Sequence, residues 1–347
     1  GGYDDSVVDI ADPVANGEGE QVTTVSINTD LTQIDWTEFN IAETEIVDFL
    51  FSQGFEDNGI VVNNILTGTT KIDGSLTSNG HVVLINPRGV LFSEGSSVNV
   101  AALTVAALGA PSGQFDGQFS LSHDAGLEAE AGAEIQPGQV LVNGTLHGTK
   151  DITLIGRSVG IGATGHLRAG LYGGDPEALL ETGTINLFAA ETVTLTLAES
   201  RLYSVAVDSE ALQDELDLDA GILNEGTISG ATVVMDSRVA DSITSAAINN
   251  SGTITATGID TSGGTIRLSG SGGGVINSNT LSVATTATDA DAIAGSITVS
   301  ADHIENAQAG AILADAAVSA SGGQITLDTS GRLLVDGTVS AQGAGSG

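Results

Sequence analysis

The sequence predicts an all-β protein that folds as a right-handed parallel β-helix, with an N-terminal cap and short excursions outside the coil. A unit centred on asparagine recurs at Asn224, Asn250 and Asn277, at intervals of 26 and 27 residues. Short segments between these units alternate polar with β-branched or aliphatic residues, which is the period of a strand. Repeats of this length built only from short strands are typical of a β-solenoid.

Aromatic residues gather near the N-terminus, which indicates that the coil is not uniform. Nine of the twelve lie before residue 121, and none follows Tyr203. A core made only of Val, Ile, Leu and Ala must be thin and regular, because aromatic side chains each bury a large area. We therefore expect a more elaborate N-terminal end followed by a plain repetitive shaft.

The repeated unit predicts how the polar groups at the corners of the coil are hydrogen-bonded. Its copies occupy residues 142–148, 223–230, 249–256, 276–283 and 335–341, with a degenerate copy at Asn306. Asn side chains at equivalent corners can stack into ladders that satisfy both the donor and the acceptor of each amide. Glycine-led segments at 264–268, 295–299 and 323–327 are the expected strands between these corners.

Two segments break the strand pattern, and we expect both to be excursions from the solenoid. Residues 175–181 begin with Asp175 and Pro176, an N-cap and a first-turn proline, and predict a short helix. Residues 208–218 are acidic with leucines at helical spacing, and predict a second helix.

The charge balance excludes several classes of protein. The chain has 347 residues with 44 Asp and Glu against 9 Lys and Arg, for a net charge of -35, yet 41% of it is hydrophobic. A disordered acidic tail would combine high charge with low hydrophobicity. Nucleic acids and anionic membranes both select for Lys and Arg, so we expect neither as a partner. Such an acidic surface suits high salt, a calcium-rich medium or cationic partners.

The absence of cysteine favours export of a large chain that crosses a membrane unfolded. The chain starts at Gly1-Gly2 without a methionine, and we interpret it as a mature chain whose signal peptide has been removed. Residues 95–115 carry no charge, but their apolar centre is too short to span a bilayer and is interrupted by polar residues. We expect that segment to form core.

No linear motif predicts catalysis or a bound cofactor. The five histidines have no metal spacing. Residues 156–160 match the spelling of a nucleophile elbow around Ser158, but a strand-like stretch follows where that motif needs a helix. Residues 160–165 match a dinucleotide fingerprint, again without the helix whose N-terminus would hold a phosphate. We expect both segments to be ordinary rungs of the coil, and no enzyme.

One acidic run leaves a calcium question open. Residues 214–219 could gather oxygen ligands for Ca²⁺, although they lack the glycine and the final glutamate of an EF-hand loop. A solvated helix face is the favoured interpretation. No other cofactor is expected.

An ordered series of motifs covers residues 34–108. It runs through Trp36 to Ile41, Val61 to Gly68, Ile72 to Leu76, Asn79-Gly80, Val83 to Phe92 and Ser97 to Leu103. This series resembles the N-terminal secretion domain of filamentous haemagglutinin-like exoproteins of bacterial two-partner secretion systems. The resemblance extends over about residues 20 to 200, and the later repeats resemble the shaft of the same family.

The resemblance implies a role for one corner in recognition by the outer-membrane transporter. Asn86, Pro87, Arg88 and Gly89 fit a type I turn, with proline second and glycine fourth. The family usually has a second asparagine where this chain has Arg88, so a role that needs that amide is in doubt. A tight corner between two rungs would by itself explain the motif. The other candidate recognition residues are Asn63, Asn64, Asn79 and Gly80.

The sequence then divides into four parts. We expect a lead-in at 1–20, a secretion domain at 21–205, an acidic helical excursion at 206–220, and shaft repeats at 221–347 that continue in a longer native protein.

The resemblance implies an exported surface protein and a specific transporter. A dedicated outer-membrane barrel with periplasmic POTRA domains would recognise the N-terminal segment by β-augmentation, and rungs would fold outside, each templated by the one before. An adhesin or extracellular filament is the favoured function, with host or neighbouring cells, glycans or its own copies as partners. The stalk of a contact-dependent toxin-delivery protein and a β-helical polysaccharide-degrading enzyme are the alternatives.

Overall fold

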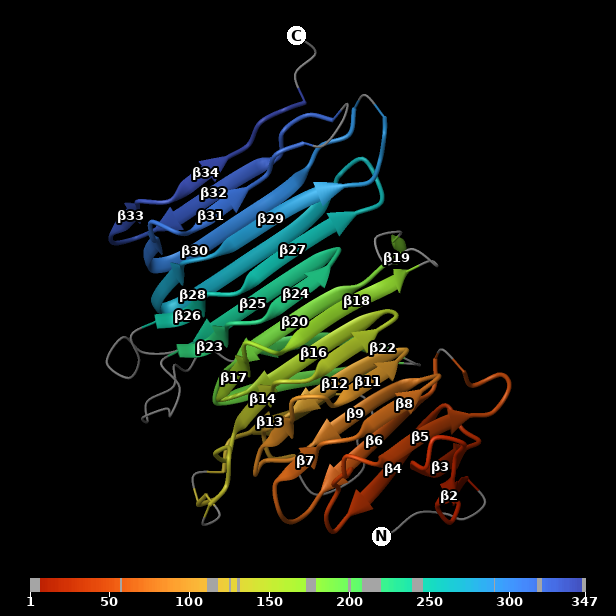
Figure 1. Ribbon diagram of the computed structural model, residues 1–347. Coiled ribbons are helices and arrows are strands. Elements are labelled where there is room, and N and C mark those ends of the chain that lie inside the picture. Colours follow the sequence, from red (N-terminus) through yellow and green to blue (C-terminus); the bar gives the residue numbers. More distant parts are fainter. Residues whose placement is uncertain are drawn as a thin grey trace.

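The protein is a stack of short strands that coil around a single axis (Figure 1). The computed structural model describes residues 7–56, 58–110, 118–124, 126–129, 132–172, 179–198, 201–207, 220–238, 246–289, 291–316 and 320–344. None of these residues lies in a helix, and so none forms a helix that could cross a membrane. Consecutive turns pair in parallel, which makes the fold the parallel β-helix that the repeats predict.

The coil has three faces, and the first is one continuous parallel ladder that runs the length of the molecule. Its strands are β3 (Gln21–Ile27), β5 (Glu45–Phe51), β8 (Ser75–Ser78), β11 (Ser97–Val100), β15 (Thr145–Gly148), β18 (His166–Tyr172), β24 (Thr227–Gly230), β27 (Thr253–Gly258), β29 (Thr280–Thr285), β31 (Ala311–Leu313) and β34 (Thr338–Ser340).

The second and third faces are joined, because β28 (Gly264–Asn277) and β30 (Gly295–Asn306) are long enough to turn the corner between them. The second face contains the first halves of β28 and β30. Its other strands are β4 (Leu31–Trp36), β6 (Ile60–Ile65), β9 (His81–Ile85), β12 (Ala102–Ala106), β16 (Asp151–Gly156), β20 (Thr184–Ala189), β25 (Thr232–Arg238) and β32 (Gln324–Thr329). The third face contains the second halves of β28 and β30. Its other strands are β7 (Thr70–Ile72), β10 (Val90–Phe92), β14 (Gln139–Val142), β17 (Ser158–Ile161), β23 (Ala220–Asn224), β26 (Ala246–Asn250) and β33 (Leu333–Val335).

The interior of the coil is a column of stacked aliphatic side chains, because alternate residues of every strand point inward. The wide side chains sit in the first rungs, where Phe49, Phe51 and Phe92 are almost completely buried. Trp36 packs there against Phe39, with 5.4 Å between ring centroids. The later rungs are filled by Val, Ile, Leu and Ala together with Met235 and contain no aromatic side chain, as the distribution of aromatic residues predicts.

A buried asparagine ladder runs up one corner of the later rungs. The Nδ2 of Asn224 donates to Oδ1 of Asn250 at 2.7 Å, Asn250 donates to Asn277 at 2.8 Å, and Asn277 donates to Asn306 at 2.7 Å. All four side chains are at most 2% exposed. This confirms the ladder predicted from the spacing of the repeats.

The two ends of the coil differ. At the first rung, β1 (Val8–Ile10) and β2 (Val14–Ala15) pair antiparallel with β3, and Val8 and Ile10 pack against the core. This is the predicted N-terminal cap. At the last rung, Leu333, Val335 and Val339 are 42–47% exposed.

A small antiparallel sheet lies outside the coil and was not predicted. It consists of β13 (Gln118–Ser122), β21 (Thr192–Ala198) and β22 (Arg201–Val207). Leu121, Val193 and Leu195 are fully buried against outward-facing side chains of β6, β9, β12, β16 and β20, such as Val62 and Ile85. The protein therefore has a second hydrophobic core outside the β-helix.

The helix predicted over residues 175–181 is wrong where the structure describes it. Leu179–Thr182 is a strand, β19, that pairs antiparallel with the end of β18. The capping signals at Asp175 and Pro176 fall outside the described residues, and the pairing with β18 decides the conformation of the rest. The acidic helix predicted over residues 208–218 also falls outside the described residues.

Candidate functional site

The corner that carries the family motif connects β9 to β10 and is built around a fully buried Asn86. Its Nδ2 donates to the backbone carbonyl of Gly68 and to Oγ1 of Thr70, both at 2.9 Å. Its Oδ1 accepts the backbone N–H of Arg88 at 2.9 Å. The amide thus ties this corner to the rung below and holds the turn in shape, so little of it remains for a partner.

The turn closes as the motif predicts. The N–H of Gly89 donates to the carbonyl of Asn86 at 3.0 Å, and Pro87 between them is half-buried. Gly89 has a φ of 104°, a conformation that favours glycine, and a Cβ there would lie 2.8 Å from Cδ1 of Ile135 and 2.9 Å from the carbonyl of Gln136. Glycine is required here by both backbone and packing.

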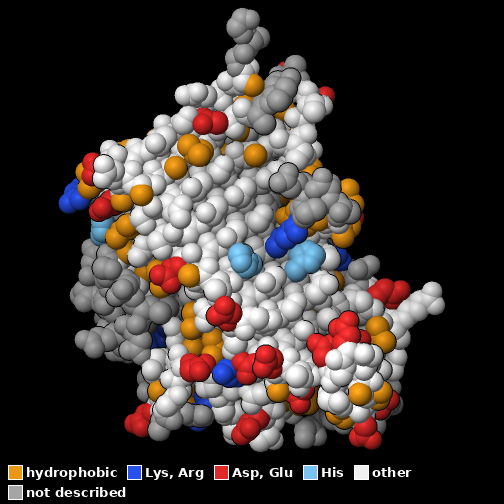
Figure 2. Space-filling model, in the orientation of Figure 1, with side chains coloured by type: hydrophobic (Ala, Val, Ile, Leu, Met, Phe, Trp, Pro, Cys, Tyr) orange, Lys and Arg blue, Asp and Glu red, His pale blue; other side chains and the backbone are white. Residues whose placement is uncertain are grey.

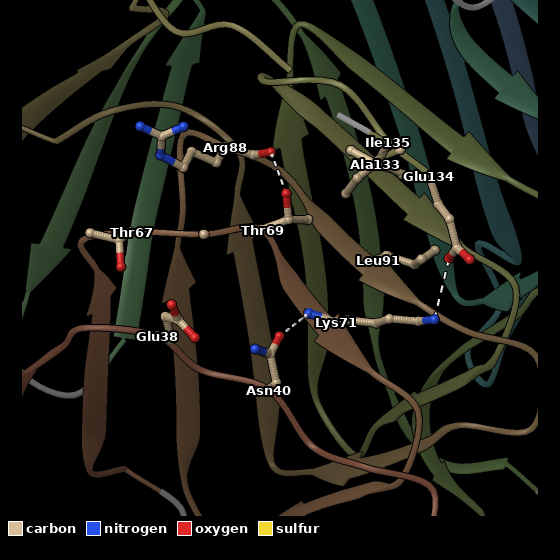
Figure 3. Close-up of a pocket in the computed structure, with 12 residues that line it drawn as sticks. Glu38, Asn40, Thr67, Thr69, Lys71, Arg88, Leu91, Ala133, Glu134 and Ile135 are labelled. Carbon is tan, nitrogen blue, oxygen red and sulfur yellow. Dashed lines mark hydrogen bonds and ion pairs between the residues drawn. The ribbon is translucent and has the colours of Figure 1, made fainter. Parts of the chain in front are cut away.

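Arg88 is the member of the motif that faces outward, and it lines a groove of about 580 Å³ (Figure 3). The groove is bounded by Glu38, Asn40, Thr67, Gly68, Thr69, Lys71, Arg88, Leu91, Gly132, Ala133, Glu134 and Ile135. Its walls come from four separate stretches of sequence: the segment after β4, the β6–β7 corner with β7, the β9–β10 corner with β10, and the loop before β14. The mixture of both charges with Leu91 and Ile135 suits a polar peptide better than a small apolar ligand.

The two cations of the groove differ in their surroundings. Nζ of Lys71 lies 3.6 Å from Asp73 and 3.4 Å from Glu134. Burial alone would lower the pKa of Lys71, but these two carboxylates outweigh it and raise the pKa above its usual value. The guanidinium of Arg88 has no hydrogen-bond or ion-pair partner among the described residues. Arg88 is thus the cation that this groove leaves available.

Asn63 and Asn64 sit side by side on β6 and serve opposite sides of the strand. Asn63 is fully buried inside the coil, where its Oδ1 accepts the indole N–H of Trp36 at 2.8 Å and its Nδ2 donates to the carbonyl of Val83 at 3.2 Å. Asn64 points outward and donates to Oδ1 of Asp35 at 2.9 Å. The motif's tryptophan and its buried asparagine therefore form one unit.

Asn79 and Gly80 form the corner at the other end of β9. The side chain of Asn79 pairs with the backbone of Phe51 in both directions, accepting its N–H at 2.8 Å and donating to its carbonyl at 2.9 Å. A Cβ on Gly80 would lie 2.4 Å from the ring of Phe51. Both residues therefore fix the packing of Phe51 at this corner.

The structure does not gather the predicted recognition residues into one site. The corners at Asn79-Gly80 and Asn86–Gly89 lie at opposite ends of the five-residue strand β9, roughly 17 Å apart. Asn63 is inside the coil. Sequence reasoning missed the acidic side of the groove at Glu38 and Glu134, because nothing in the local sequence indicates that the loop before β14 lies beside β7.

The segments that imitate catalytic motifs are ordinary rungs. Ser158 begins β17 directly after the corner that follows β16, and it is buried. Its neighbour Arg157 is paired with Glu191 at 3.1 Å. Residues 160–165 are the end of β17 and a corner, with no helix after them. Among the described residues, no three His, Cys, Asp or Glu side chains are grouped as metal ligands.

Comparison with known proteins decides the family. The TPS secretion domain model matches residues 6–283, which is most of the chain. The chain belongs to the TPS secretion domain family. It therefore carries the secretion domain of a two-partner secretion exoprotein, a protein exported across the outer membrane, and this domain is what the partner outer-membrane transporter recognises. The family is a secretion domain rather than an enzyme family.

Relatives and solved structures agree with this assignment. A heme/hemopexin-binding protein of Haemophilus influenzae (strain Rd) is 26% identical over 216 residues, which is 62% of this chain and 21% of the relative. A second Haemophilus influenzae heme/hemopexin-binding protein is 36% identical over 81 residues, 23% of this chain and 8% of that protein. This TPS domain chain thus spans about a fifth or less of the length of these relatives.

The fold has a close counterpart among solved structures. The crystal structure of the HMW1 secretion domain from Haemophilus influenzae matches with a TM-score of 0.66, covering 97% of this chain and 90% of that one at 18% identity. At this identity the likeness establishes the shared β-helix.

Proposed function

We propose that this TPS domain presents the groove beside Arg88 to its transporter, and that the rest of the chain is the start of an adhesin or extracellular filament. The observation that carries the first part is Arg88 at the outward position of the Asn86–Gly89 corner, whose guanidinium has no partner among the residues that the structure describes. A transporter segment with an acidic side chain would pair with it. Asn86 and Gly89 act by shaping the corner, and Asn63, Asn64, Asn79 and Gly80 by shaping the rungs on either side.

Folding outside the cell would proceed by templating. Each described rung of the shaft pairs in parallel with the next in matching register, as β24 does with β27 and β27 with β29. A rung that has formed therefore presents a strand edge on which the next rung can pair its backbone and bury its inward side chains. Free energy released by each added rung would draw the chain outward without ATP.

We propose the same domain limits that the sequence suggests: a lead-in at 1–20, the secretion domain at 21–205, an excursion at 206–220, and shaft rungs from 221. The ladder that begins at Asn224 supports a change of character near residue 221. The family match continues to residue 283, so the first shaft rungs also resemble the TPS domain family.

The transporter contact is tested by charge at position 88. Arg88→Glu should reduce secretion by the cognate transporter at least tenfold, while Arg88→Lys should retain most of it. Arg332→Glu is the matched control, since Arg332 is an exposed arginine near Glu305 on a late rung. The readout is the ratio of protein in the medium to protein in the periplasm. Normal export of Arg88→Glu would remove the groove from the proposal.

The proposed activity after export is binding to host or neighbouring cells, glycans or other copies of the chain. Such a protein retains cells or carbohydrate without turnover. Cells that display the exported protein should adhere to a surface or aggregate more than cells in which the transporter is deleted. Equal adhesion of the two strains would contradict the adhesin.

A further inference from the structure

The outward side of the first face carries two straight columns of short polar side chains. We call it the hydroxyl face and define it from β8 to β34. One column contains Ser75, Ser97, Thr145, His166, Thr227, Thr253, Thr280, Ala311 and Thr338, and the other contains Thr77, Asn99, His147, Arg168, Ser229, Thr255, Ser282, Leu313 and Ser340. Serine or threonine fills twelve of these eighteen positions.

From β8 to β34 neither column contains a carboxylate, and carboxylates meet the columns at their two ends, where Asp48 on β5 accepts the hydroxyl of Thr77 at 2.7 Å and Asp315 accepts that of Ser340 at 2.6 Å. The second face is different, because Asp35, Asp151, Asp236 and Asp328 all point outward from its strands. In Figure 2 the broad middle of the visible surface is mostly white, and red side chains gather around the lower rungs and the margins.

None of the eighteen side chains is buried, so the columns are open to a partner. Neighbouring rungs lie about 4.8 Å apart, and residues two apart on a strand lie about 6.7 Å apart, so the hydroxyls form a regular two-dimensional array. Threonine is stiff at χ1, which holds much of this array in place before a ligand arrives. A preorganised surface spends less conformational entropy on binding.

We propose that the hydroxyl face binds an uncharged polysaccharide. Cationic partners would be drawn to the acidic surfaces elsewhere, and polyanions would be repelled by a net charge of -35. A neutral chain of sugar hydroxyls matches the donors and acceptors of serine and threonine, and its regular repeat suits a regular array. The inference rests on the glycan binding proposed above, for which it names the surface and the class of glycan, and it does not depend on the route of export.

A cluster of flat side chains in the middle of the face supports this ligand class. Arg168 stacks on the ring of Tyr172, with its guanidinium carbon 3.4 Å from the ring centroid, and His147 lies 6.3 Å from the same ring. Nε2 of His147 is held 3.2 Å from the carbonyl of Gly170. Flat side chains in fixed positions give a sugar ring an apolar surface beside the hydroxyls.

The test is retention of the purified chain on insoluble cellulose, chitin and cross-linked dextran, with heparin–agarose as the anionic comparison. Thr255→Asp with Ser282→Asp places two carboxylates on adjacent rungs of the hydroxyl face. The matched control, Thr298→Asp with Thr326→Asp, does the same on the second face. Thr255→Ala with Ser282→Ala removes the hydroxyls without adding charge, and thermal unfolding verifies that each variant folds.

We expect retention on at least one uncharged polysaccharide, insensitive to salt, that falls at least tenfold in the Asp pair and severalfold in the Ala pair but not in the control. Retention on none of the three, retention on heparin alone, or equal loss in the control would each overturn the proposal. So would self-association that the Asp pair abolishes, since the face would then bind a second copy.

Discussion

The rungs up to β12 and the rungs from β23 onward differ in how the asparagine side chains at their corners are hydrogen-bonded. In the early rungs each corner has its own solution: Asn79 pairs with the backbone of Phe51, and Asn86 reaches Gly68 and Thr70. In the later rungs one solution is repeated, with each ladder asparagine bonded to the next. An early corner therefore depends on particular partners, whereas a late corner depends on having a like neighbour.

This difference fits the division of work in the molecule. A transporter must recognise something unique, and a corner with its own geometry and an outward Arg88 provides it. A shaft must add rungs of the same kind, and a repeated amide provides the same contact each time. Four experiments test how deep the difference goes.

The largest effect should follow from Asn86→Ala. The substitution leaves the Gly68 carbonyl, the Thr70 hydroxyl and the Arg88 N–H without their partner in a buried corner, which should cost about 3 kcal/mol of unfolding free energy. Urea denaturation measures it. Asn99→Ala, an exposed asparagine on β11, is the control and should change stability by less than about 0.5 kcal/mol. Equal losses would mean that the buried amide has no special role.

Asn250→Ala should cost less, about 2 kcal/mol, because the flanking asparagines keep other partners. The substitution removes the acceptor of Nδ2 of Asn224 and the donor to Oδ1 of Asn277, but Oδ1 of Asn224 retains the N–H of Gly226 and Nδ2 of Asn277 still donates to Asn306. The same urea experiment compares the two variants directly. A loss larger than that of Asn86→Ala would reverse the comparison, because stability would then depend more on a ladder asparagine than on the early corner.

His81 should make the early rungs sensitive to acid. Burial, and to a lesser extent Lys150, lowers the pKa of His81 to about 4, and its Nε2 lies 2.9 Å from Oγ1 of Thr104. The unfolded chain takes up this proton near pH 6.5 and the folded chain only near 4, so the His81 contribution to stability falls as pH drops between these values. The loss from pH 7 to about pH 4.5 should be about 2 kcal/mol.

The control for this pH dependence is His81→Gln, which keeps a polar partner for Thr104 but does not titrate. The urea midpoint of each protein is measured at both pH values. Because the two proteins carry the same carboxylates, the carboxylate contribution cancels when their pH dependences are subtracted. The difference between them isolates the imidazole. Parallel pH profiles would show that His81 takes up its proton at the same pH in the folded protein as in the unfolded chain.

The smallest effect should come from Lys71→Ala in the groove. Its ion pairs with Asp73 and Glu134 are solvent-exposed, so their loss should change stability by less than about 1 kcal/mol. Thermal unfolding at low and high salt measures it, and the salt dependence should be slight. A large loss would show that the groove is held together by charge, which would complicate its use as a recognition surface.

Much of the architecture could be predicted because it repeats. Spacing of Asn224, Asn250 and Asn277 indicates the period, and alternation indicates the inward face. The antiparallel sheet outside the coil could not be found this way, since Phe119 and Leu195 meet across more than seventy residues. The helix predicted over residues 175–181 is wrong at 179–181, because local capping signals say nothing about pairing with β18.

The sequence predicts one part of the candidate site, the corner, and does not predict the groove beside it. The motif identifies the corner, and the turn residues do what their types predict. The groove beside it depends on where the loop before β14 returns, which is a property of the whole coil. Sequence can therefore indicate which corner matters but not what lies opposite it.

The asparagine ladder also has a direction. Every amide nitrogen donates toward the later rung, and at Asn306 the last donor is met by the main-chain carbonyl of Thr338 at 3.2 Å. The other hydrogen of these amides is bonded within its own rung, as from Asn250 to the carbonyl of Gly252. In a coil that grows as proposed, the newest rung therefore presents one unpaired amide hydrogen, which an oxygen at the same height in the next rung must accept. A rung that arrives one residue out of step would leave this donor stranded in the core, at a cost of about 1–3 kcal/mol. The ladder therefore disfavours a misaligned turn by the free energy of one unpaired buried amide before the next turn stacks on it.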